Sequence, residues 1–159
     1  MPLTLDLPLP TLPETLHVAE LPLPLLALTL RQPWATAVRD LGKRVENRSW
    51  QPPEHVLGKI IAIHAGKTFD ERGADWIAAR TGRMTTTRNV PMGAVVALAR
   101  VARVVTKGAP EDFWFSGPYG WYFDDVVELD PIPCGGRRQL WALPEQVRKQ
   151  ILEQMTKSE

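Results

Sequence analysis

The sequence predicts an α+β fold in which about six short strands form a mixed sheet and about three helices pack outside it. Fifteen prolines among 159 residues indicate short elements that are interrupted often. The stretch from Ala27 to Trp50 joins a strand, a helix and a charged return strand, so strands and helices are mixed along the chain. The length fits one domain with one hydrophobic core.

The first strand and helix are defined by a change in periodicity. Apolar and polar side chains alternate from Ala27 to Gln32, as in a half-buried strand. Pro33 then lies where the first turn of a helix tolerates proline. One apolar stripe follows at helical spacing and comprises Trp34, Val38 and Leu41. Gly42 supplies the left-handed conformation that ends such a helix, so we predict a helix from Pro33 to Leu41.

A charged segment follows this helix at once. If the segment is extended, Val45 faces the core. The opposite face then carries Arg44, Glu46 and Arg48. A core strand seldom carries so much charge. The segment is either a solvated row of ion pairs on an exposed strand or part of a site that holds an anion or a polar base.

Positive charge is concentrated around this segment. Residues 26–107 contain fourteen basic and six acidic side chains, although the net charge of the whole chain is only +1. Arg31 lies where the first strand meets the start of the helix, and free N–H groups beside a guanidinium favour a phosphate or carboxylate. Lys43 and Arg48 add further charge. This distribution indicates a polyanionic partner more clearly than the net charge does.

The order of these residues resembles the ASCH family, a branch of the PUA-like small β-barrels. In that family a strand ending in R-Q-P-W leads through a helix to G-x-K-x-x-E-x-R. This chain has RQPW at residues 31–34, followed by Lys43, Glu46 and Arg48 at the same mutual spacing. The family glycine lies two residues before the lysine, whereas Gly42 lies one residue before it. The resemblance spans residues 27–144 and implies a PUA-like small mixed β-barrel.

The next strand and helix supply two more candidate residues. Lys59 to His64 is apolar on both faces, as in a central strand that is covered on each side. Thr68 and Glu71 have the spacing of a capping box, which predicts a helix from residue 69 to about residue 80. His64 and Lys67 therefore lie at a second junction between strand and helix. His64 is either part of the site or a hydrogen-bonded histidine at the end of the barrel.

The C-terminal half adds the remaining elements. Residues 93–106 are expected to form a long β-branched strand that bends, in which Arg100 and Arg103 have opposite parity and face the same way only if a bulge intervenes. Aromatic residues cluster between positions 113 and 123, and of these we select Trp121 as a surface on which a base stacks. A closing strand spans residues 139–143, and a helix over residues 144–156 carries a stripe of Val147, Ile151 and Met155.

Residues 1–25 differ from the rest of the chain. They contain six prolines, nine leucines and no Lys or Arg, so we expect an N-terminal arm that is extended or disordered, followed by one domain over residues 26–159. The arm has no signal-peptide pattern, and no other stretch is apolar enough to span a membrane. The lone Cys134 excludes an internal disulfide. These features predict a cytoplasmic protein, and they leave its oligomeric state open.

Two functions fit this sequence. The first is a binding module whose basic cleft holds RNA, a nucleotide or a nucleoside. Its candidate residues are Arg31, Gln32, Trp34, Lys43, Glu46, Arg48, His64, Lys67 and Trp121. The alternative, implied by the family resemblance, is a hydrolase that cleaves an acyl amide on modified cytidine or cleaves RNA, with Lys43 and Glu46 as catalytic residues. Neither function requires a cofactor, and we expect no metal site.

Overall fold

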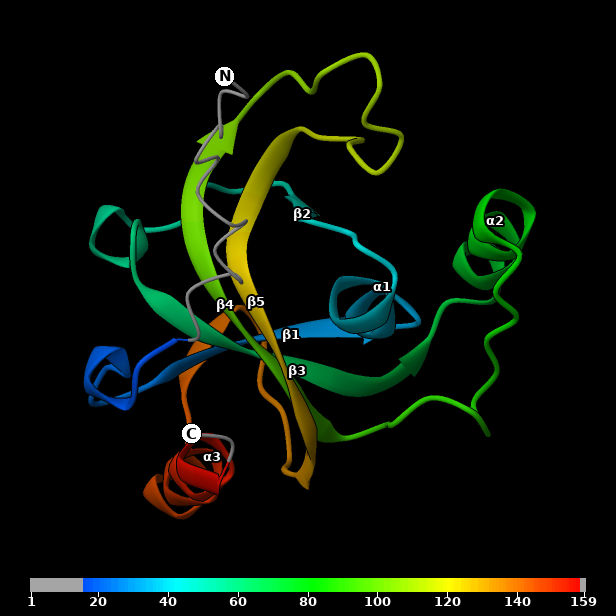
Figure 1. Ribbon diagram of the computed structural model, residues 1–159. Helices are drawn as coiled ribbons and strands as arrows, with labels where there is room; N and C mark the ends of the chain where they lie inside the picture. Colours follow the sequence, from blue (N-terminus) through cyan, green and yellow to red (C-terminus); the bar gives the residue numbers. More distant parts are fainter. Residues whose placement is uncertain (1–15, 158–159) are drawn as a thin grey trace, which may run out of the picture.

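The computed structural model describes residues 16–157, which form one six-stranded sheet and three α-helices (Figure 1). The strands are β1 (Leu26–Gln32), β2 (Val45–Arg48), β3 (Ile60–Phe69), β4 (Ala94–Val105), β5 (Tyr119–Pro133) and β6 (Leu140–Ala142). The helices are α1 (Trp34–Asp40), α2 (Glu71–Thr81) and α3 (Glu145–Lys157). The predicted α+β class and its numbers of strands and helices are confirmed.

The sheet is mixed and curved. Its strand order is β2-β5-β4-β3-β1-β6, in which β1 and β3 are parallel and the other neighbouring pairs are antiparallel. The chain passes through α1 and β2 between β1 and β3, because parallel neighbours need a long connection. The sheet curves far enough for the side chain of Arg48 in β2 to reach β1, where its Nη2 donates to the Thr29 carbonyl at 2.7 Å.

Both faces of the central strands are buried. In β3, Ile60 and Ala62 belong to the core cluster that includes the apolar face of α3. Ile61 and Ile63 point the other way, into the cluster that includes the apolar residues of α1. In Figure 1, α1 lies within the curve of the sheet and α3 lies outside it. The prediction of a central strand that is apolar on both faces is therefore confirmed.

The outer face of the sheet is covered by α3 and by the segment that precedes β1. The predicted stripe of α3 is confirmed, because its buried residues are Val147, Ile151 and Met155. Residues 16–25 contain one turn of 3₁₀-helix (Val18–Glu20), and Leu16, Leu21 and Leu25 pack into the same cluster as α3. The rest of the predicted arm, residues 1–15, lies outside the described residues.

The turn after α1 determines where the charged segment begins. The helix starts at Trp34, one residue later than predicted, with Pro33 at the N-cap. It ends before Gly42, whose φ of +74° is the left-handed conformation expected from the sequence. The N–H of Lys43 donates to the carbonyl of Ala37 at 3.1 Å, so the chain folds back on the helix at this point.

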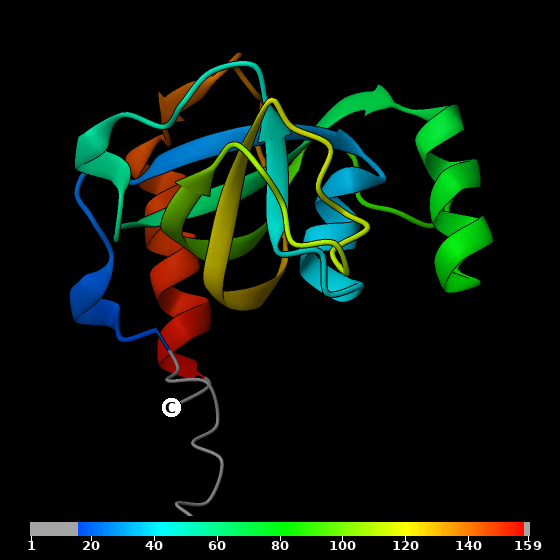
Figure 2. The ribbon, with the colours of Figure 1, turned by 90° about the horizontal axis from the view of Figure 1, so that it is seen from above.

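The start of α2 differs from the prediction. β3 continues through Phe69, so Thr68 is a strand residue and forms no capping box with Glu71. Asp70 is the N-cap instead, and its Oδ1 accepts from the N–H of Gly73 at 2.9 Å. The helix stands away from the curved sheet (Figures 1 and 2). Within residues 16–157, no helix is both long enough and apolar enough to cross a membrane.

The bend predicted in the fourth strand is present. The register between β4 and β5 shifts at three points, one of them between Leu98 and Arg100. Arg100 therefore faces the N-terminal segment, where it pairs with Glu20 at 2.9 Å, while Arg103 lies over the ring of Tyr122 at 4.6 Å. The pairs Val101–Phe123 and Val104–Trp121 both pack in one core cluster, so the shift between Val101 and Arg103 places the two arginines on the same face despite their opposite parity.

Candidate functional site

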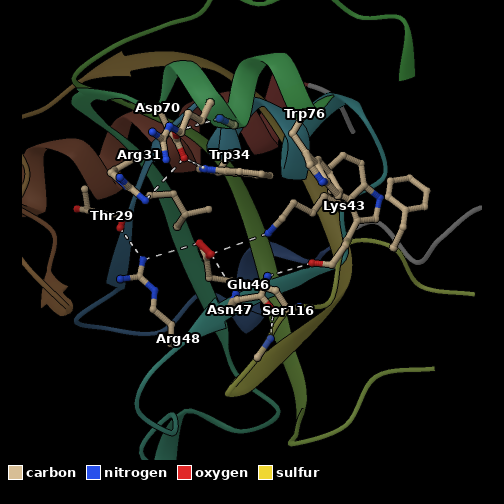
Figure 3. A pocket seen from close by; sticks show the side chains of 16 residues that line it. Thr29, Arg31, Trp34, Lys43, Glu46, Asn47, Arg48, Asp70, Trp76 and Ser116 are labelled. Atoms are coloured by element: carbon tan, nitrogen blue, oxygen red, sulfur yellow. Dashed lines mark hydrogen bonds and ion pairs between the residues drawn. The ribbon is translucent and has the colours of Figure 1, made fainter. Parts of the chain in front are cut away.

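A cavity of about 600 Å³ opens between β2, the start of α2 and the loop before β5 (Figure 3). We call it the aromatic pocket. Its lining consists of Thr29, Leu30, Arg31, Trp34, Lys43, Glu46, Asn47, Arg48, Asp70, Arg72, Gly73, Trp76, Phe113, Trp114, Ser116 and Gly117. The pocket therefore combines large aromatic rings with charges of both signs. Its volume is that of a small-molecule site.

A buried carboxylate lies between two cations in this pocket. Glu46 Oε1 lies 3.9 Å from Lys43 Nζ, and Glu46 Oε2 lies 3.8 Å from Arg48 Nη2. Glu46 Oε1 also accepts from the N–H of Asn47 at 3.1 Å. The expectation that Arg44 shares a face with Glu46 and Arg48 is wrong, because Arg44 precedes β2 and turns away. Its guanidinium donates to the carbonyl of Val38 at 2.8 Å, and it does not line the pocket.

Lys43 is held in an unusual environment for an ammonium group. Its side chain is only 2% exposed, and Nζ donates to the carbonyl of Val45. Nζ also lies 5.6 Å from the ring centre of Trp34. Burial lowers the pKa of Lys43, and Arg48 lowers it further, whereas the nearby Glu46 carboxylate raises it. The net direction is downward because the loss of hydration is the largest of these effects.

Asp70 joins the start of α2 to α1. Its Oδ2 accepts from Trp34 Nε1 at 3.0 Å and lies 3.8 Å from Arg31 Nη2. The hydrogen bond from the Gly73 N–H, followed by that from Trp34, lowers the pKa of Asp70. Gly73 lies so close to the indole that an added Cβ would come within 2.7 Å of Trp34 Cζ2. A glycine at this position therefore lets α2 approach Trp34.

Three separate segments supply the aromatic wall. The ring centres of Trp34 and Trp76 are 6.0 Å apart, and those of Trp76 and Trp114 are 5.5 Å apart. Phe113 lies 4.8 Å from Trp114 and remains half exposed. From the sequence we selected only Trp121 among the aromatic residues at positions 113–123, and Trp76 was not among the candidate residues. The run of Phe113 and Trp114 before a glycine–proline turn was the available signal.

Asn47 holds the aromatic loop in place. Its Nδ2 donates to the carbonyl of Trp114 at 3.0 Å, while its Oδ1 accepts from the N–H groups of Ser116 and Gly117 at 2.8 and 3.0 Å. Asn47 is the residue between Glu46 and Arg48 in β2, so the strand that carries the charges also positions the rings (Figure 3). Nothing in the sequence pattern singled out this residue.

Two residues predicted for the site have structural roles. Trp121 is 0% exposed, its Nε1 donates to the carbonyl of Trp50 at 3.1 Å, and it does not line the pocket. The choice of Trp121 as a stacking surface is therefore wrong. Gln32 is also buried, with Oε1 accepting from the N–H of Thr36 and Nε2 donating to the carbonyl of Pro91. Its amide oxygen and nitrogen each have a partner within the fold, and Gln32 does not line the aromatic pocket.

His64 and Lys67 lie beside a second, neighbouring cavity. His64 therefore does not line the aromatic pocket with Lys43, Glu46 and Arg48, whereas Arg31 lines both cavities. His64 is 1% exposed and has a partner at each nitrogen. Its Nε2 donates to the carbonyl of Cys134 at 2.7 Å, and Nδ1 lies 3.1 Å from Thr29 Oγ1. Burial lowers the pKa of His64, so the ring favours the neutral form.

The described residues contain no group of three or more His, Cys, Asp or Glu side chains arranged to hold a metal ion. The pocket chemistry therefore consists of aromatic surfaces, one buried carboxylate and several cations. Such a site can stack a planar ring and hydrogen-bond its polar edge.

No family model matches the sequence, and no curated protein matches it. Solved structures do match. A crystal structure of ASCH from Zymomonas mobilis aligns with a TM-score of 0.50 and 16% sequence identity, covering 82% of this chain and 94% of that one. A mutant form of the Zymomonas mobilis protein aligns with the same TM-score and identity, covering 82% of this chain and 97% of that one. The chain therefore has the ASCH fold, a PUA-like fold, as the sequence resemblance predicted.

Replacement of Asn47 by alanine should release the aromatic loop. Three hydrogen bonds are lost, and we expect the free energy of unfolding to fall by about 1–3 kcal/mol. Hydrogen exchange at residues 112–118 should become faster, and the tryptophan fluorescence should change. Asn89→Ala is the matched control, because Asn89 also bonds backbone groups but in an exposed loop at residues 84–89. If both variants leave the exchange of residues 112–118 unchanged, Asn47 does not hold the loop.

Replacement of His64 by glutamine should alter the dependence of stability on pH. Because the pKa of His64 is lowered in the folded state, the unfolded chain binds a proton below about pH 6.5 that the folded chain does not. The free energy of unfolding of the wild type should therefore fall as the pH drops below this value. In His64→Gln this fall should be smaller, since glutamine keeps a donor and an acceptor but does not titrate. Identical pH profiles in urea unfolding would contradict this assignment.

Proposed function

We propose that the protein binds RNA, or a nucleotide derived from it, in the aromatic pocket. The observation that carries this proposal is the combination of three indole rings with a buried carboxylate in one cavity. Trp34, Trp76 and Trp114 line the same space as Glu46. An unstacked base needs an aromatic surface for its face and a fixed hydrogen-bonding group for its edge.

The charges support a base with a phosphate rather than an uncharged ligand. Arg31 extends into the opening with 63% of its side chain exposed, and its pairing with Asp70 at 3.8 Å is loose. The Nε of Arg48 is buried and has no hydrogen-bond partner among the described residues, so it needs an oxygen from a ligand or water. Both arginines line the pocket that contains the Glu46 carboxylate, and their guanidinium groups suit a phosphodiester oxygen.

Glu46→Gln tests the role of the carboxylate. The substitution keeps the shape and keeps an acceptor for the N–H of Asn47, but it removes the charge. If Glu46 accepts from an exocyclic amino group, binding should weaken by about 1–3 kcal/mol for the base that supplies that group. Oligouridylate has no such amino group and should be affected least. The measurement is fluorescence anisotropy with short single-stranded homo-oligonucleotides.

Glu71→Gln is the control for this experiment. Glu71 is exposed at the start of α2 and does not line the pocket, so its loss removes the same charge without touching the site. Equal weakening for all bases with Glu46→Gln would mean that the carboxylate acts only through Lys43 and Arg48. Failure of the wild type to bind any oligonucleotide or nucleotide at low salt would reject the proposed function.

A second candidate function is hydrolysis of an amide on a modified nucleoside, or cleavage of RNA. The observation that favours it is the lowered pKa of Lys43, because a neutral amine is the form that acts as nucleophile or base. Two contacts oppose it. Nζ already donates to the carbonyl of Val45, and Glu46 raises the pKa of Lys43.

Lys43→Ala separates the two functions. We expect no conversion of acylated cytidine or RNA by the wild type in a liquid-chromatography assay, and weaker RNA binding by the variant. Product formation that disappears in Lys43→Ala would instead make the protein a hydrolase. Thermal unfolding of the variant is the necessary control, since Lys43 is buried and its loss leaves Glu46 without one of its two cations.

A further inference from the structure

A second cavity of about 440 Å³ lies next to the aromatic pocket and differs from it in charge. We call it the basic pocket. It is lined by Thr29, Leu30, Arg31, His64, Gly66, Lys67, Thr68, Gly135, Gly136, Arg137 and Arg138. Every side chain in this lining that carries a full charge is positive. The aromatic pocket, in contrast, contains the carboxylates of Glu46 and Asp70.

The cations of the basic pocket are not neutralised within the fold. The side chains of Lys67, Arg137 and Arg138 are exposed, and within residues 16–157 none of them has a hydrogen bond or an ion pair. Arg31 is the fourth cation, and its only ion pair there is the loose one with Asp70. Converging positive charges without counter-charges repel one another, so an anion placed between them is stabilised.

The backbone of this pocket is held by buried groups. Trp141 Nε1 donates to Thr29 Oγ1 at 2.9 Å, and Thr29 Oγ1 in turn lies 3.1 Å from His64 Nδ1. His64 Nε2 then donates to the carbonyl of Cys134, which begins the turn that carries the two arginines. An added Cβ at Gly136 would come within 2.5 Å of His64 Cε1, so the turn lies directly on the imidazole ring. The histidine thus fixes the backbone of the turn that carries Arg137 and Arg138.

The two pockets adjoin at the end of β1. Thr29, Leu30 and Arg31 line both of them. A ligand that occupies the aromatic pocket with its base can therefore extend past Arg31 into the basic pocket. A free nucleoside is too small to use both pockets and has no charge for the second.

We propose that the basic pocket binds a backbone phosphate of the nucleotide that follows or precedes the base in the aromatic pocket. The physiological ligand is accordingly single-stranded RNA of at least two nucleotides rather than a free nucleoside. This inference rests on the proposed function, since it requires the base to occupy the aromatic pocket. Guanidinium and ammonium groups, such as those that line the basic pocket, are the ordinary protein ligands of a phosphodiester.

The test compares two short oligonucleotides with the same bases and 2′-O-methyl sugars, one with phosphodiester and one with uncharged methylphosphonate linkages. Wild type should bind the phosphodiester form about tenfold or more tightly, as expected for charge-assisted hydrogen bonds. The triple variant Lys67→Gln, Arg137→Gln, Arg138→Gln should lose most of this preference and bind the methylphosphonate form as wild type does. In this triple variant, the slope of log K against log salt should become shallower by about 0.7 for each phosphate contact that is lost.

A matched triple variant removes the same charge elsewhere. Arg83, Arg88 and Lys107 are exposed, line neither pocket and have no ion pair within the described residues. Their replacement by glutamine should leave the preference for the phosphodiester form unchanged. The slope of log K against log salt should differ from wild type by less than about half of the value for one phosphate contact. Thermal unfolding of both variants establishes that they are folded.

The possible outcomes separate this inference from the proposed function. Equal binding of the two oligonucleotides by wild type overturns the phosphate site but leaves base binding in the aromatic pocket intact. Retention of the full preference by the Lys67, Arg137 and Arg138 variant also overturns it. If wild type binds neither oligonucleotide nor any nucleotide, both proposals are rejected.

Discussion

The guanidinium of Arg48 makes the contacts on which the geometry of the site depends. It donates to the carbonyl of Thr29 at 2.7 Å and lies 3.8 Å from the carboxylate of Glu46. β2 is an edge strand that pairs only with β5 in the sheet, so this side chain is what links it to β1. The same contact therefore holds the curved sheet together at its opening and orients the charged residues there.

Each of the three residues of β2 that follow Val45 has a separate role in the aromatic pocket. Glu46 provides the buried negative charge, Asn47 fixes the loop with Trp114, and Arg48 connects the strand to β1. The strand is only four residues long, so its own ladder contributes little to its position. Its side-chain contacts to β1 and to the aromatic loop compensate for this shortness. The lining of the aromatic pocket and the support of β2 are thus made by the same few residues.

The pairing of Lys43 with Glu46 has an energetic consequence for the site. Burial of an ammonium group is costly, and here it is partly offset by the carboxylate, by the carbonyl of Val45 and by the face of Trp34. A polar group that enters the pocket meets charges that are already desolvated and oriented. Such preorganised groups discriminate between ligands more strongly than flexible surface charges do.

Much of the fold followed from local patterns in the sequence. The two-sided burial of β3, the left-handed turn at Gly42 and the stripe of α3 all depend on residues close together in the chain. The start of α2 was missed because two N-cap signals compete there, and Asp70 rather than Thr68 accepts from a helix N–H group. Either residue can cap a helix by its local chemistry. Asp70 is the cap because β3 continues through Phe69 and includes Thr68.

The sequence by itself determined which residues carry charge near β2, because Lys43, Glu46 and Arg48 are close in the chain and their spacing places them together. Only the tertiary structure decided which aromatic rings join them. Trp34, Trp76 and Trp114 come from distant segments of the chain. Their rings come into contact because the sheet is curved and α2 lies away from it. It also decided that Trp121 and Gln32 serve the core and that His64 faces a separate pocket. The physical reason is that burial and partner choice depend on contacts between segments far apart in the chain, which no local spacing encodes.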